Sequence, residues 1–126
     1  MTDPPMDEAA FEQLVSEALA TVPADFQQYM ENLQIIIQDR ATPEQMQSVG
    51  LSPPHTLLGL YHGVPLTERG MYKPLMPDQI TLFRVPLLER YGTGEGLRQQ
   101  VRRTVLHEIA HFFGITDDRL HELDAY

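Results

Sequence analysis

The 126-residue sequence contains no cysteine. Disulfide bonds and metal sites built on thiolates are therefore excluded, and any protein ligand of a metal must be a nitrogen or oxygen atom. The absence of cysteine does not by itself identify a cellular compartment.

Basic residues are also scarce, since 9 Lys and Arg stand against 18 Asp and Glu and give a net charge of −9. A protein with this charge repels a phosphate backbone as a whole, so we expect no nucleic-acid partner. Arg98, Arg102 and Arg103 nevertheless cluster and could hold an acidic group. The usual surface placement of arginine favours the simpler interpretation, a solvated face of a helix.

No apolar run is long enough to cross a membrane, although 42% of the residues are hydrophobic, an ordinary share for a globular protein. The first eight residues carry acids where a secretory signal would carry lysine or arginine before an apolar core. The sequence therefore predicts a cytoplasmic protein with no membrane partner. Its length suits a single domain over residues 1–126.

Local signals predict several helices. Thr2 or Asp3 before Pro4 and Pro5 is typical of a helix start, and apolar residues at helical spacing continue this helix to about Pro23. Short helices with their own start or stop signals are expected at Ala24–Met30, Pro43–Val49 and Pro86–Tyr91.

Three segments have the character of strands and complete an α+β pattern. Asn32–Asp39 is expected to be a central strand, buried on both faces around Ile36. Thr56–Tyr61 and Gln79–Val85 are the other two strands. Residues 62–78 between them are rich in glycine and proline and predict a long loop, which in a compact domain is often functional.

A last long helix is expected to begin at Thr93 or Gly94 and to end near Phe113. In its second half, apolar side chains cover most of the circumference. The remaining arc, roughly 100° wide by helical geometry, holds Thr104, His107, Glu108 and His111. A polar arc this narrow predicts a mostly buried helix whose polar side chains face a cleft.

Two histidines in this arc, His107 and His111, are four residues apart. On a helix they lie one turn apart on the same face, so both imidazoles can reach one metal ion, as in a zinc site. Glu108 follows the first histidine directly, where its carboxylate can act as a general base on water without binding the metal itself.

Gly114 comes three residues after His111 and can take the left-handed conformation that ends a helix. The chain would then turn back, and our hypothesis is that Asp117 supplies the third metal ligand. Glu122 is the competing candidate, because some zinc sites take a downstream glutamate as third ligand.

The run His107–Asp117 resembles the extended H-E-x-x-H-x-x-G-x-x-(H/D) motif of the metzincin branch of the zincin metallopeptidases, with aspartate in the last place. The segment Leu57–Leu66 and the motif near the C-terminus are similar to the small bacterial zincin-like metallopeptidases, over residues 10–124. This resemblance implies a single zincin-like domain, in which a small mixed β-sheet packs against an N-terminal helix and the C-terminal motif helix.

The resemblance also implies a zinc metallopeptidase that hydrolyses peptide bonds in a peptide or protein substrate. One Zn²⁺ would be held by His107, His111 and Asp117, and Glu108 would be the catalytic base. In zincins an edge strand above the metal pairs with the substrate backbone, and Leu57–Tyr61 would be that strand. Its Tyr61, or the adjoining His62, would be a candidate to stabilise the oxyanion, although ordinary packing of the tyrosine is the favoured interpretation.

Two alternatives belong to other functional classes. No methionine follows Asp117, so the methionine turn of metzincins is absent from the sequence. A non-catalytic metal-binding or interaction module that keeps the zincin fold is therefore an alternative. A metal-dependent ribonuclease with two helical histidines is the less favoured one, because such proteins generally lack the adjacent glutamate and carry basic surfaces.

Overall fold

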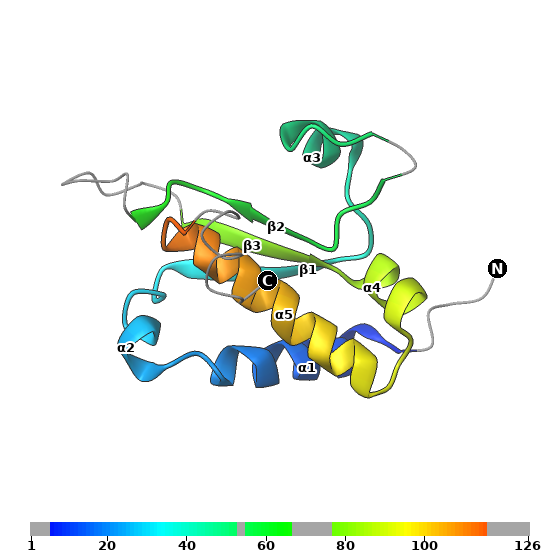
Figure 1. Cartoon of the computed structure of the whole chain (residues 1–126), viewed down its shortest axis with the longest axis horizontal. Coiled ribbons are helices and arrows are strands. Elements are labelled where there is room, and N and C mark those ends of the chain that lie inside the picture. The colour runs from blue at the N-terminus through cyan, green and yellow to red at the C-terminus, as the bar shows by residue number, and fades with distance from the viewer. Residues whose placement is uncertain (1–5, 53–54, 67–76, 116–126) are drawn as a thin grey trace.

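The computed structural model describes residues 6–52, 55–66 and 77–115, and Figure 1 shows their arrangement. The elements follow the order α1 (Glu8–Ala20), α2 (Ala24–Gln27), β1 (Leu33–Gln38), α3 (Pro43–Ser48), β2 (Gly59–His62), β3 (Asp78–Phe83), α4 (Arg84–Tyr91) and α5 (Glu95–Phe112). This is the predicted α+β architecture. None of the described helices is both long enough and apolar enough to span a membrane.

The first helix, α1, begins later than the sequence predicted. Asp7 caps it, since its carboxylate accepts a hydrogen bond of 2.8 Å from the backbone N–H of Ala10. A start at Thr2 or Asp3 is therefore wrong, because a second capping residue nearer to the apolar stripe satisfies the free amides. The helix ends at Ala20, shortly before the predicted end.

The three strands form a mixed sheet of order β1-β3-β2. β1 runs parallel to β3 and β2 runs antiparallel to it. The prediction that Asn32–Asp39 is the central strand is wrong, because β1 lies at an edge of the described sheet and Ile36 is only partly buried. The central strand is β3, in which all residues but Gln79 are buried. A run of isoleucines indicates burial, but it does not specify how many strands lie beside it.

One hydrophobic core joins the helices to the sheet. α1 packs along α5, and α5 in turn packs on β2 and β3 (Figure 1). The side chains that meet in this core recur at helical spacing on α1 and α5 and alternate on β3: Phe11, Leu14, Val15, Ala18, Ile80, Leu82, Leu97, Val101, Val105 and Ile109. The small mixed sheet thus packs against the N-terminal helix and the motif helix, as expected.

The shorter helices agree with the sequence signals except at their ends. α3 begins with a capping box, in which Thr42 and Gln45 each accept from the other's backbone N–H. α2 stops at Gln27, before the expected Met30. The third strand ends at Phe83 rather than at Val85, since the following residues form the first turn of α4, where Pro86 is tolerated. The expected loop 62–78 lies largely outside the described residues.

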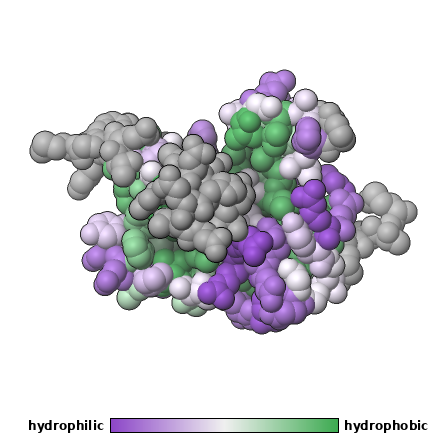
Figure 2. All heavy atoms as spheres, viewed as in Figure 1, coloured by the Kyte–Doolittle hydropathy of each residue, from purple (hydrophilic) through white to green (hydrophobic). Residues whose placement is uncertain are grey.

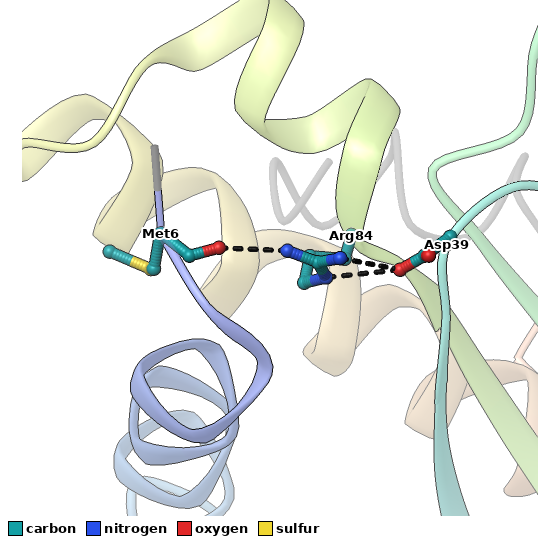
Figure 3. A network of polar contacts seen from close by, with 3 residues as sticks. All are labelled: Met6, Asp39 and Arg84. Carbon is teal, nitrogen blue, oxygen red and sulfur yellow. Dashed lines mark hydrogen bonds and ion pairs between the residues drawn. The ribbon is translucent and has the colours of Figure 1, made fainter. Parts of the chain in front are cut away.

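Arg84, the first residue of α4, joins three separate parts of the chain (Figure 3). Its guanidinium donates to the Met6 carbonyl over 2.8 Å and to the Asp39 carboxylate over 2.7 and 3.1 Å. The arginine side chain is only 12% exposed, whereas that of Asp39 is 68% exposed. The segment before α1, the end of β1 and the start of α4 are therefore held together by one nearly buried cation.

Replacing this cation tests its contribution to stability. We expect Arg84→Gln to lower the free energy of unfolding by about 1–2 kcal/mol, because a nearly buried guanidinium loses its charge-assisted hydrogen bonds. Arg40→Gln is the matched control, since its ion pair with Glu89 is exposed, at 60% and 61% for the two side chains. That control should change the free energy by less than about 0.5 kcal/mol. Urea denaturation of both variants measures the difference, and equal effects would contradict the assignment.

Candidate metal centre

The candidate site lies on α5, which runs from Glu95 to Phe112 after Gly94 as its N-cap. Its core-facing side chains recur every three to four residues, so burial of this stripe sets the rotation of the helix about its axis. With the stripe packed against α1 and β3, the polar arc identified in the sequence is turned toward β2. Packing of the core thereby decides where the histidines point.

The two histidines of the motif lie side by side on this helix. The ring centroids of His107 and His111 are 4.6 Å apart, with an angle of 67° between the rings. Together with Glu108 they each offer a ligand atom, and these atoms all lie within 4.8 Å of one another. Among the described residues, this is the cluster of histidine and acidic side chains that could hold a metal ion.

Glu108 is almost fully buried, with 7% of its surface exposed. Its Oε1 lies 3.3 Å from Nδ1 of His111, one turn further along the helix. Burial of a carboxylate is costly unless charged or hydrogen-bonded partners compensate, so this position is suited to a group that a cation stabilises. The glutamate therefore lies beside the two histidines of the motif, within the fold rather than on its surface.

Gly59, the first residue of β2, allows α5 to approach the sheet at this point. A Cβ atom at residue 59 would lie 2.7 Å from the Thr104 methyl group and 3.3 Å from Cγ of Glu108. The strand backbone thus packs directly against the helix, and the backbone at Gly59 limits the space open to the side chain of Glu108. Sequence reasoning did not identify this glycine as part of the site.

A cleft of about 370 Å³ opens in front of the polar arc. Residues from β2 and the segment before it, from α4 and from α5 line it: Leu58, Gly59, Arg90, Gln100, Arg103, Thr104, His107 and Glu108. The volume is within the range of small-ligand sites. The predicted narrow polar arc of a largely buried helix therefore faces a cleft.

The helix ends as the sequence predicted. Gly114 has a φ of 84°, its N–H donates to the carbonyl of His111, and the N–H of Ile115 donates to the carbonyl of Ala110. These two bonds form a Schellman motif, which requires the left-handed conformation that glycine adopts without strain. The chain consequently changes direction one turn after the second histidine.

Aromatic side chains hold this end of α5 in place. Phe113 packs edge-on against Phe26, at a centroid distance of 5.2 Å, and against Tyr29 at 6.2 Å. Phe112 is buried and packs against Tyr61 of β2 at 6.1 Å. Contacts on both sides of the helix therefore limit movement of the turn that carries His111.

Several predicted residues have other positions. Asp117 and its competitor Glu122 lie outside the described residues, so the third ligand stays a prediction. Tyr61 donates a hydrogen bond to the buried carboxylate of Asp78, whereas His62 is exposed. The Tyr61 hydroxyl thus has a structural partner in β3, which agrees with the favoured interpretation of a packed strand tyrosine.

The donor set is chemically suited to zinc. Imidazole nitrogens and carboxylate oxygens are ordinary Zn²⁺ ligands, and catalytic zinc sites keep a coordination position open beside their protein ligands. Here ligand atoms of the two imidazoles and of the buried carboxylate lie within 4.8 Å of one another, and His107 and Glu108 line the cleft. A small cation would offset the cost of burying Glu108.

A model of the zincin-like metallopeptidase family matches residues 30–126 of the chain. The match spans the sheet, the cleft and the motif helix. The chain belongs to the zincin-like metallopeptidase family.

A solved structure offers a second comparison for this zincin-like protein. A conserved hypothetical protein from Thermus thermophilus is 25% identical in sequence, with a TM-score of 0.52. The similarity covers 94% of this chain and 97% of that one, so the two share their fold over nearly their whole length. No curated protein sequence matches the chain significantly. These comparisons support the fold and the implied metal, and they do not specify an activity.

The close approach at Gly59 can be tested by adding one methyl group. We expect Gly59→Ala to lower the free energy of unfolding of the zincin-like domain by about 1–3 kcal/mol, because a β-branched threonine cannot move away freely. Gly96→Ala is the control, since its Cβ would lie 3.7 Å from the nearest atom. That control should be neutral or slightly stabilising. Thermal unfolding of both variants measures the effect, and an unchanged Gly59→Ala protein would contradict the close packing.

Proposed function

We propose that this protein is a zinc-dependent metallopeptidase that hydrolyses peptide bonds. The observation that carries the proposal is the meeting of His107, buried Glu108 and His111 on one turn of α5, where His107 and Glu108 line a cleft. Membership of the zincin-like family supports the same chemistry.

His107 and His111 would hold one zinc ion, with Asp117, outside the described residues, as the proposed third ligand. When bound, zinc supplies Lewis acidity, which polarises a carbonyl group and makes water easier to deprotonate. The imidazoles are positioned for this role by the helix itself, since residues four apart share one face. Their rings already lie 4.6 Å apart.

Glu108 would serve as the general base and then as the general acid. Its carboxylate takes the proton from the attacking water and passes it to the leaving amine. Burial beside Gly59 and Thr104 limits the side chain's conformations, so the carboxylate is held at the cleft instead of in bulk water. The 3.3 Å contact with His111 keeps it next to the metal-binding group.

The substrate backbone would lie along β2. This strand is the outer strand of the described sheet and packs directly on α5, so it borders the cleft. An extended peptide can bind to such a strand through main-chain hydrogen bonds, which provide affinity without strong sequence demands. The resemblance to zincins assigns the same role to this segment.

Metal content and turnover can be separated by two substitutions. We expect the purified protein to contain one zinc per chain, and Glu108→Gln to keep this zinc while losing at least about 100-fold in peptide hydrolysis, the usual contribution of a general base. His111→Ala should lose both zinc and hydrolysis, because a ligand is removed. Metal analysis by mass spectrometry and cleavage of a random peptide library measure the two properties.

Glu95→Gln provides the control, since it makes the same chemical change at an exposed position in the first turn of α5. It should leave zinc content and hydrolysis unchanged. Full turnover by zinc-loaded Glu108→Gln would overturn the mechanism. Stoichiometric zinc without hydrolysis in the unmodified protein would instead identify a non-catalytic metal-binding module.

A further inference from the structure

We propose that Arg90 and Arg103 form a subsite for a carboxylate of the substrate, next to the metal centre. The inference rests on the proposed function, because it assigns the substrate class of the same cleft. The peptides bound would carry an acidic side chain or a free C-terminal carboxylate close to the scissile bond.

The two arginines come from different elements and converge on one cavity. Arg90 lies in the last turn of α4 and Arg103 lies one turn before His107 on α5, and both line the cleft that also contains His107 and Glu108. Arg90 and Arg103 are thirteen positions apart in the sequence, so no helical or strand repeat relates them. Only the packing of α4 against α5 brings the two positive charges together.

Neither arginine has an acidic partner among the described residues. Two arginines on the same helices are paired: Arg84 binds Asp39, and Arg98 binds Glu17 over 2.9 Å. Arg102 shares the lack of a described acidic partner, but it does not line this cleft. In a chain with a net charge of −9, carboxylates are abundant, yet none of the described ones lies within 4.0 Å of the Arg90 or Arg103 side-chain nitrogens. A positive charge without a protein partner at a cleft is suited to an anionic ligand.

The predicted arginine cluster of α5 is in fact divided between two faces. Arg98 and Arg102 line a separate groove between α5 and α1, with Glu17 as the acidic neighbour of Arg98. Arg103 alone of the three lines the cleft of the metal centre. Figure 2 shows that strongly hydrophilic side chains gather over the first half of α5 and over α4, with more hydrophobic atoms toward α3.

The spacing along α5 relates the arginine to the reacting bond. Arg103 and His107 are four residues apart, which corresponds to about 6 Å along a helix axis. An extended peptide covers this distance in about two residues. A carboxylate held by Arg103 would therefore belong to a residue within about two positions of the scissile bond.

The ligand chemistry follows from the guanidinium group and from the size of the cleft. A guanidinium matches a carboxylate with two parallel N–H···O hydrogen bonds. A cavity of about 370 Å³ accommodates a few side chains of a peptide. An acidic side chain and a C-terminal carboxylate present the same group, and the experiment distinguishes them.

Binding can be measured without turnover in the zinc-loaded Glu108→Gln protein. The probe is an acetylated random hexapeptide library in two forms, with a carboxylate or an amide at the C-terminus. Captured peptides are identified by mass spectrometry. We expect one of two enrichments among the captured peptides. Either Asp and Glu are enriched over Asn and Gln, or peptides with a C-terminal carboxylate are enriched over peptides with a C-terminal amide. The expected enrichment is roughly five- to tenfold, the range for partly exposed charge-assisted hydrogen bonds.

Arginine variants in the same background assign the selectivity to the subsite. Arg90→Gln and Arg103→Gln should each reduce the enrichment, and Arg103→Glu should reverse it toward lysine and arginine. Arg102→Gln is the matched control, because it removes the same charge from the neighbouring position outside the cleft. It should keep the enrichment. Circular dichroism and zinc content verify that each variant is folded and loaded.

Three outcomes would contradict the proposed subsite. They are equal enrichment in Arg103→Gln and Arg102→Gln, no preference for acidic peptides, and no captured peptide. The proposed function has a separate readout, the cleavage of the same library by the unmodified protein. Cleavage without acidic selectivity would retain the peptidase and exclude the subsite. Acid-selective binding without any cleavage would retain the subsite and exclude the peptidase.

Discussion

The packing of α5 between α1 and the sheet is the constraint on which the rest of the structure depends. Its core stripe, which includes Val101 and Val105, determines the rotation of the helix, and this rotation turns the polar arc toward β2. The candidate metal centre consequently depends on the packing of the core, because its residues lie on the same helix as the core side chains. A change in core packing would move the histidines even where the altered residues do not belong to the candidate metal centre.

Charge is distributed unevenly over this fold. The chain is strongly acidic overall, yet the described cleft is lined by two arginines and by one buried carboxylate, Glu108. Elsewhere the basic side chains Arg84 and Arg98 are paired with carboxylates. Net charge therefore describes the long-range field of the protein, whereas the proposed carboxylate subsite depends on the two cleft arginines that have no acidic partner among the described residues.

The agreement between sequence and structure differs from one feature to another. Helix ends with explicit capping residues, at Thr42 and Gly114, were predicted correctly because capping depends on neighbouring residues only. The start of α1 was placed too early because Thr2 or Asp3 and also Asp7 can cap a helix, and all of them precede the same apolar stripe. The edge position of β1 could not be predicted, since its isoleucines indicate apolar faces but not the number of neighbouring strands.

The sequence by itself determined the shared face of His107 and His111, the position of Glu108 between them and the turn at Gly114. These features follow from the helical repeat and from backbone conformation, which are local. The tertiary structure alone decided that Gly59 packs against Glu108 and that Arg90 and Arg103 line the same cleft. These contacts join residues far apart in the chain, and they arise only when the burial of apolar surface brings β2, α4 and α5 together.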